Sequence, residues 1–179
     1  MNPIFLIGYM GAGKSTIGRK LADELGWSFI DTDIFIEARF RERICDMFTS
    51  VGEEVFRRRE RVVIEELSGM ENCIIATGGG LPCFHGNMDL MNTCGTTLYL
   101  SATNEVLAER LELCKRTRPS VRNKTGEELL LHVQEAMSVR DAIYRQAQLE
   151  ESVNELRNEE DEVALAIRLA QRLRQLRLV

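Results

Sequence analysis

Residue types that mark several protein classes are scarce in this chain of 179 residues. It contains five cysteines and two histidines, and no two of the cysteines form a C-x-x-C pair. Disulfide-stapled scaffolds need an even cysteine framework, and structural zinc sites need cysteines and histidines at ligand spacing. The sequence supports neither class and predicts reduced thiols.

Long apolar runs are also missing. The apolar stretch near the amino terminus is too short to cross a bilayer. It has no basic segment before it and no small-residue cleavage site after it. We therefore predict a cytoplasmic protein with no membrane partner.

Positive charge is in the minority. Lysine and arginine total 23 residues against 28 aspartates and glutamates, which gives a formal net charge of −5. A chain without a basic field is not expected to bind nucleic acid. Of the cations, 19 are arginine and only 4 are lysine, and the planar guanidinium group matches carboxylates and phosphates. This composition favours an anionic small molecule as the ligand.

The sequence does contain the pattern of a single α/β domain. Apolar residues make up 44% of the chain and charged residues 28%, as in ordinary globular proteins. Short apolar runs bounded by turn residues predict buried strands, with helical periodicity between them, at 4–7, 28–31, 73–76 and 97–100. Apolar residues over 160–177, including Val163 and Ile167, predict a final helix packed on the sheet. We predict an α/β fold in which helices cover both faces of a parallel sheet, in one domain over 1–179.

The strongest motif is Gly8–Ser15, which satisfies the pattern G-x-x-x-x-G-K-[ST] between a predicted strand and a predicted helix. Its glycines let backbone N–H groups surround a phosphate, while Lys14 reaches the β- and γ-phosphates and the Ser15 hydroxyl can ligate Mg²⁺. The alternative, a plain glycine turn, would not need Lys14 and Ser15 together. The predicted nucleotide-binding residues are Gly11, Ala12, Gly13, Lys14, Ser15 and Thr16.

Asp31 and Asp33 follow the second predicted strand. On an extended backbone both carboxylates would point the same way and Thr32 the opposite way. Asp31 would hold Mg²⁺ with Ser15, and Asp33 would accept a hydrogen bond or a proton from a substrate hydroxyl. Alternatively, one or both carboxylates cap a helix that begins near Ile34.

A helical insertion is predicted over 34–68. Ser50–Glu53 fits a capping box, so we expect a helix to begin near Val51 and to carry Arg57. Glu60, one turn away, would orient Arg57 as a carboxylate-binding fork. The alternative is that the arginines of this helix form an exposed charged face.

Two further segments are predicted to border the site. Gly78, Gly79 and Gly80 follow the third strand and expose backbone N–H groups that a ligand can approach closely; a flexible turn is the alternative. Residues 115–126 are polar with almost no apolar anchors, as in a mobile lid over a site; a solvated connector is the alternative.

Taken together, these segments resemble the shikimate kinase family, within the nucleoside-monophosphate-kinase-like branch of P-loop proteins. The resemblance covers about residues 4–145. It implies ATP-dependent phosphorylation of the 3-hydroxyl of shikimate by a monomeric enzyme, with Mg²⁺ as cofactor and with ATP and shikimate as partners. The segments that carry the resemblance are 8–16, 29–33, 44–48, 52–53, 56–60, 77–80, Arg118-Pro119 and 140–144.

The resemblance also implies individual roles. Asp33, Arg57, Gly79 and Arg140 would hold shikimate, with the two arginines on its carboxylate. Arg118, in the lid over 115–126, would reach the ATP phosphates and act with Lys14 and Mg²⁺ on the transferring group. Phe48 and Phe56 would wall the substrate pocket within the 34–68 insertion. The segment after Tyr144 matches the family poorly, so no adenine contact is assigned.

Two other functions fit part of the pattern. A gluconate-type kinase would share the phosphate loop but phosphorylate an open-chain sugar acid. A nucleotide-binding switch without transfer activity would not need a second anion site. The combination of Asp33, Arg57 and the three glycines favours a ring diol that bears a carboxylate.

Overall fold

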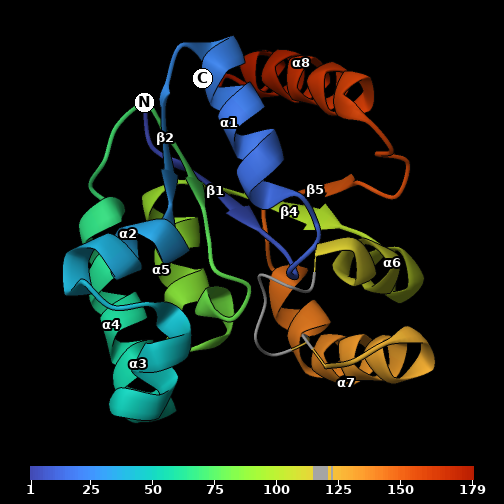
Figure 1. The fold of residues 1–179 in the computed structure, drawn as a ribbon. Coiled ribbons are helices and arrows are strands. Elements are labelled where there is room, and N and C mark those ends of the chain that lie inside the picture. Colours follow the sequence, from blue (N-terminus) through green and yellow to red (C-terminus); the bar gives the residue numbers. More distant parts are fainter. Residues whose placement is uncertain (115–120, 122) are drawn as a thin grey trace.

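The computed structural model describes residues 1–114, 121 and 123–179. At its centre is a five-stranded parallel sheet with the strand order β2-β3-β1-β4-β5 (Figure 1). The strands are β1 (Ile4–Ile7), β2 (Ser28–Asp31), β3 (Cys73–Ala76), β4 (Thr96–Ser101) and β5 (Leu149–Ser152). The four predicted strands are confirmed. The edge strand β5 was not predicted, because its sequence Leu-Glu-Glu-Ser contains no apolar run.

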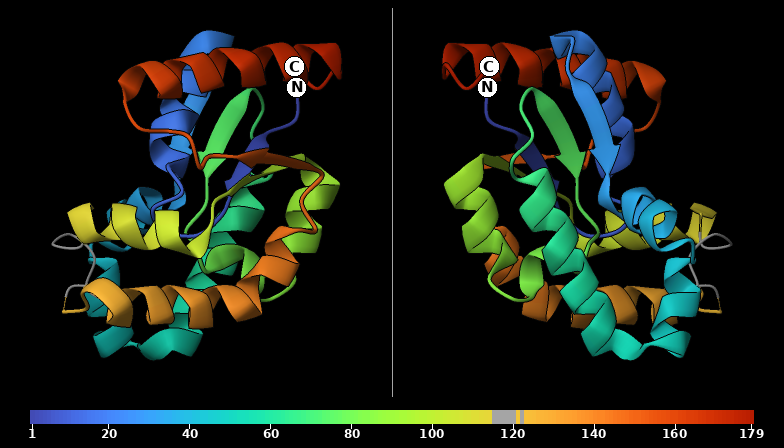
Figure 2. Two further views of the ribbon diagram at one scale, coloured as in Figure 1. Left: turned by 90° about the vertical axis from the view of Figure 1, so that its right-hand side faces the viewer. Right: turned by 90° about the vertical axis from the view of Figure 1, so that its left-hand side faces the viewer.

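Helices cover both faces of this sheet, which confirms the predicted α/β architecture. Figure 2 shows α1 and α8 on one face, with the other helices grouped toward the opposite face. None of the helices in the described part of the chain is long and apolar enough to cross a membrane. The helices are α1 (Lys14–Leu25), α2 (Thr32–Phe40), α3 (Ile44–Ser50), α4 (Gly52–Leu67), α5 (Asn87–Cys94), α6 (Asn104–Cys114), α7 (Gly126–Tyr144) and α8 (Glu159–Gln175), with a short 3₁₀ turn, η1 (Leu81–Cys83).

The core lies around the central strands. Every residue of β1 and β3 is buried, as expected for parallel strands covered on both faces. The register places Asp31, the last residue of β2, beside Ala76, the last residue of β3. Because the strands are parallel, the loops that follow β1, β2 and β3 leave the sheet at the same edge.

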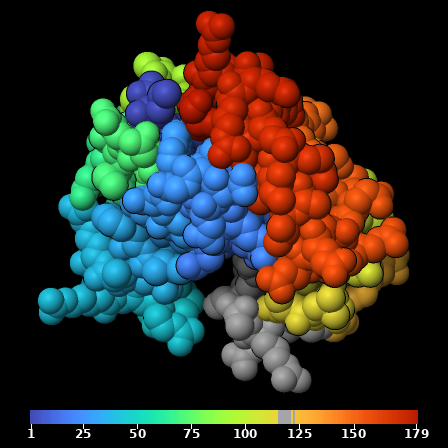
Figure 3. Space-filling model, turned by 90° about the horizontal axis from the view of Figure 1, so that it is seen from above, coloured from blue at the N-terminus to red at the C-terminus, as the bar shows by residue number. Residues whose placement is uncertain are grey.

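The final helix is present, but its buried face differs from the predicted one. α8 lies beside α1 (Figure 3), and Lys20 of α1 forms an ion pair with Glu159 at 3.0 Å. Val163 and Ile167, which were expected to be buried, are 42% and 39% exposed. Two neighbouring apolar stripes run along this helix, and packing against α1 selects the one that contains Leu165, Leu169 and Leu173.

The predicted helical insertion over 34–68 consists of α2, α3 and α4, but the expected capping box is wrong. Ser50 is the last residue of α3, and its hydroxyl donates to Glu42 Oε1 at 2.5 Å. α4 begins at Gly52 after Val51, and no side chain caps it. Because Ser50 still belongs to the preceding helix, its hydroxyl cannot cap the next one.

Candidate active site

The predicted phosphate loop connects β1 to α1. Gly13, with a φ of 87°, is the residue before the first turn of α1, and this left-handed conformation suits glycine. Lys14 is buried and folds back over the loop, where its Nζ donates to the carbonyls of Gly8 (2.7 Å) and Tyr9 (3.0 Å). The loop therefore combines a lysine cation with the amino terminus of a helix, an arrangement that attracts anions.

Ser15 and Asp31 meet at the start of α1. The Ser15 hydroxyl donates to Asp31 Oδ2 at 2.5 Å. The other carboxylate oxygen, Oδ1, accepts from the backbone N–H groups of Asp33 (3.0 Å) and Ile34 (3.4 Å). Asp31 therefore caps α2, as the alternative interpretation proposed, and also contacts the phosphate loop.

The predicted alternation of Asp31 and Asp33 along one strand is wrong. β2 ends at Asp31, and Asp33 lies in the first turn of α2. The backbone turns there because Asp31 caps the helix. Asp33 nevertheless lines the cavity beside the phosphate loop.

A cavity of about 540 Å³ contains most of the predicted substrate residues. One part of its wall is polar, and the other is apolar. Gly79 joins the cavity to the phosphate loop, because a Cβ atom there would lie 3.5 Å from the Met10 nitrogen. The polar wall includes Asp33, Arg57, Glu60, Gly78, Gly79, Gly80 and Arg140, and the apolar wall includes Met10, Ile44, Phe48 and Phe56.

Arg57 is the buried cation of this cavity. Its Nη1 lies 2.8 Å from Glu60 Oε2, and its Nη2 lies 3.0 Å from Glu53 Oε1. The side chain of Arg57 is only 10% exposed, so the exposed charged face considered as an alternative does not include it. Burial lowers the pKa of Arg57, but its partners Glu60 and Glu53 raise it above the ordinary value. The guanidinium group therefore keeps its charge inside the cavity.

Two of the three glycines leave space for charged side chains. At Gly80 a Cβ atom would lie 2.6 Å from Arg57 Nη1, and at Gly78 a Cβ atom would overlap Asp33 Oδ1. Any larger residue at either position would displace a side chain of the cavity. The glycine turn therefore acts as a backbone wall against which Asp33 and Arg57 lie.

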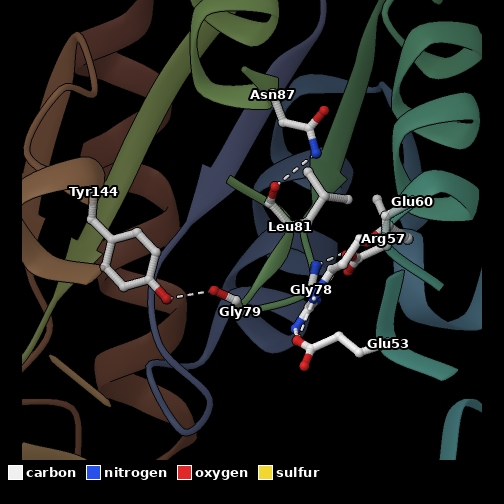
Figure 4. Close-up of polar contacts among 9 residues, drawn as sticks. Glu53, Arg57, Glu60, Gly78, Gly79, Leu81, Asn87 and Tyr144 are labelled. Carbon is white, nitrogen blue, oxygen red and sulfur yellow. Dashed lines mark hydrogen bonds and ion pairs between the residues drawn. The ribbon is translucent and has the colours of Figure 1, made fainter. Parts of the chain in front are cut away.

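Residues that sequence reasoning did not single out anchor the glycine turn (Figure 4). Thr32 Oγ1 accepts from the Gly78 N–H at 2.8 Å, and the Tyr144 hydroxyl donates to the Gly79 carbonyl at 2.5 Å. Asn87 donates to the carbonyl that follows the glycines, at 2.8 Å. These three side chains come from α2, α7 and α5. No local sequence signal could have found them, because each contact joins segments that only the fold brings together.

The predicted catalytic residue Arg118 lies outside the described residues, as do 115–120 and 122 of the predicted lid. Within the described part of the lid, Val121 is fully buried, and α7 begins at Gly126. Lys124 forms an ion pair with Glu128 at 3.1 Å. Closure of the lid over the phosphates stays a prediction.

Glu60 should make the stability of the protein depend on pH. Burial raises its pKa from the ordinary 4.5 to about 7, although the Arg57 charge lowers it. Between these pH values the folded protein binds more protons than the unfolded chain, so this group makes the free energy of unfolding fall as the pH rises. Glu60→Gln should remove this contribution.

Chemical denaturation of both proteins at pH 5 and pH 7.5 tests this expectation. Relative to Glu60→Gln, the unsubstituted protein should lose about 2–3 kcal/mol of stability between the two pH values. Glutamine keeps an oxygen acceptor for Arg57, so the ion pair becomes an uncharged hydrogen bond without loss of shape. A stability difference that stays constant over this pH range would contradict the assignment.

A phosphate loop between the first strand and first helix of a parallel sheet, with an aspartate on its serine, defines a P-loop nucleotide-binding protein. The chain belongs to the shikimate kinase family, since the model of the family described as "Shikimate kinase" matches residues 10–171. A shikimate kinase from Azobacteroides pseudotrichonymphae is 51% identical over 150 residues, which cover 83% of this chain and 88% of that protein.

Solved structures agree with this assignment. A crystal structure of shikimate kinase from Bacteroides thetaiotaomicron is 39% identical, with a TM-score of 0.91 over 97% of this chain and 98% of that one. Shikimate kinase from Acinetobacter baumannii in complex with shikimate is 31% identical, with a TM-score of 0.86 over 100% and 96%. A gluconokinase from Sinorhizobium meliloti is only 18% identical, with a TM-score of 0.55 over 98% and 97%, and resembles this chain in fold alone.

Proposed function

We propose that this family member transfers the γ-phosphoryl group of ATP to the 3-hydroxyl of shikimate. The observation that carries the proposal is one cavity that lies against the phosphate loop and also contains Arg57 and Arg140. A hydroxylated ring with a carboxylate fits such a cavity, because its two ends need different partners. The arginines bind the carboxylate, and the hydroxyl to be phosphorylated lies toward the phosphate loop.

The proposed mechanism depends on position and charge. Lys14 and the amino terminus of α1 bind the ATP phosphates and offset the charge that develops during transfer. Asp33 accepts a hydrogen bond from the attacking hydroxyl and so orients its oxygen. Arg118 would add a second cation from the lid. Phe48 and Phe56 cover the ring of the substrate and limit the access of water.

Ser15 and Asp31 fit a magnesium site. Both offer oxygen ligands, which Mg²⁺ prefers, and they lie 2.5 Å apart beside the phosphate loop. Among the described residues no group of three or more His, Cys, Asp or Glu side chains forms a metal cage. Such a pair suits an ion that keeps several waters and binds the phosphates of its nucleotide. When bound, Mg²⁺ would neutralise phosphate charge, while Ser15 and Asp31 would fix its position.

Isothermal titration calorimetry with shikimate, with and without a non-hydrolysable ATP analogue, tests the proposal. We expect shikimate to bind in at least one of these states and gluconate to bind much more weakly. Binding of the nucleotide without either acid would favour a nucleotide-binding switch, whereas preference for gluconate would favour the sugar-acid kinase. Absence of shikimate binding in both states would overturn the proposal. A monomeric state, a cytoplasmic location and a single domain over 1–179 remain predictions of the sequence.

A further inference from the structure

The side chain of Phe84 lies behind Arg57 rather than in the cavity. The Phe84 ring centroid is 4.1 Å from Arg57 Cζ, the shortest cation–ring distance in the described part of the chain. Phe48 and Phe56, which line the cavity, are farther away, at 5.7 and 5.4 Å. Phe84 is not among the described residues that line the cavity, so it has a contact with the arginine but none with the space for the substrate.

We propose that Phe84 is a positioning residue that fixes the plane of the Arg57 guanidinium group and thereby sets the affinity for the substrate carboxylate. The proposal rests on the proposed function. Phe84 follows η1, so it belongs to the same short segment as Gly80. The guanidinium group also lies against Gly80, where a Cβ atom would be 2.6 to 3.0 Å from Nη1, Nη2 and Cζ. One segment therefore supplies both a flat backbone surface and an aromatic ring to the same cation.

The ion pairs of Arg57 do not fix this plane by themselves. Glu53 Oε1 accepts from Nε (3.2 Å) and Nη2 (3.0 Å), and Glu60 Oε2 accepts from Nη1 (2.8 Å). A guanidinium group has five N–H donors. Among the described residues these bonds use three of them, which leaves one on each Nη atom for a bidentate carboxylate. The direction in which these two donors point depends on the plane of the group.

An aromatic ring is well suited to this task because it is uncharged. Glu53 and Glu60 already place two carboxylates beside Arg57, and a third would further repel a carboxylate substrate. The face of a phenyl ring attracts a cation through its quadrupole and adds no net charge. Phe84 therefore stabilises one orientation of Arg57 without weakening the attraction between Arg57 and the substrate.

Steady-state kinetics of Phe84→Leu and Phe84→Tyr test the proposal. Leucine keeps an apolar side chain but removes the ring, and we expect the KM for shikimate to rise about three- to tenfold. The kcat and the KM for ATP should change less than about twofold, because the phosphate loop is untouched. Phe84→Tyr keeps the ring and should restore the KM for shikimate to within about twofold. Phe84→Met, another apolar replacement, serves if Phe84→Leu fails to fold.

The chain offers a matched control. Phe40 lies 4.4 Å from Arg59 Cζ, and neither residue lines the cavity in the described part of the chain. Phe40→Leu removes a similar ring–arginine contact and should leave the KM for shikimate unchanged. In an Arg57→Lys background, Phe84→Leu should raise this KM much less than it does alone, since the planar group is already gone.

The outcomes separate the two proposals. Failure of the unsubstituted protein to phosphorylate shikimate would overturn the proposed function, and this inference with it. Normal turnover by that protein together with an unchanged KM for shikimate in Phe84→Leu would overturn the inference alone. Equal rises in both KM values, or an equal effect in the Arg57→Lys background, would also overturn it, because a merely structural role predicts them.

Discussion

Lys14→Ala is expected to lower kcat by about a hundredfold to a thousandfold or more, with the protein still folded. Lys14 Nζ contacts only loop carbonyls among its printed partners, at 2.7 and 3.0 Å, so its main contribution is a positive charge where the phosphates bind. No other described residue of the phosphate loop has a cationic side chain. Without that charge, the transferring phosphoryl group loses stabilisation in the transition state. Single-turnover assays, with circular dichroism to check the fold, measure this effect.

Lys20→Ala is the matched control. Lys20 lies in the same helix, but it pairs with Glu159 and Glu162 at the surface, away from the phosphate loop. Its replacement should leave kcat within about twofold, because a surface ion pair contributes about 1 kcal/mol or less to stability. Near-normal turnover by Lys14→Ala would refute the assignment of the phosphate loop.

The central sheet could be predicted from the sequence because its strands are buried on both faces. β1 and β3 are continuous apolar runs, and such runs followed by turn residues are a direct signal. β5 gives no such signal, since it pairs with β4 alone and two of its four residues are exposed. Its place in the sheet depends on pairing with a segment about 50 residues away in sequence.

The candidate site was predictable where the chemistry lies within one motif. The phosphate loop is such a case, because Gly8–Ser15 contains both the glycines and the charged residue. Arg57 is different, since neighbouring arginines gave it the pattern of an exposed face. Its burial results from contacts with Gly80 and Phe84, more than 20 residues further along the chain. Periodicity within one helix does not contain that information.

Asp31 illustrates a third situation, in which two interpretations that were set against each other are both compatible with the geometry. Its carboxylate has two oxygens, and one accepts from the amides of α2 while the other accepts from Ser15. By capping α2 it turns the chain at Thr32, which brings Asp33 to the cavity and leaves Thr32 to anchor Gly78. The end of one strand therefore determines the position of both aspartates.

Arg57→Ala is expected to weaken shikimate binding about ten- to a hundredfold while ATP binding changes little, because a charge-assisted hydrogen bond contributes about 1.5–3 kcal/mol. The variant also leaves Glu60 buried without its cation, which can cost about 3–5 kcal/mol of stability. The same substitution should therefore be made in a Glu60→Gln background, where no carboxylate is left unpaired.

Calorimetric titration with shikimate and with an ATP analogue separates binding from folding in this pair of variants. If Arg57 binds the substrate carboxylate, the loss of shikimate affinity should persist in the Glu60→Gln background while the loss of stability becomes smaller. Arg58→Ala is the control, since Arg58 pairs with Glu54 on the exposed side of the same helix. Equal losses for shikimate and the ATP analogue in Arg57→Ala would mean that Arg57 supports the fold rather than the substrate, because only a direct contact distinguishes the two ligands.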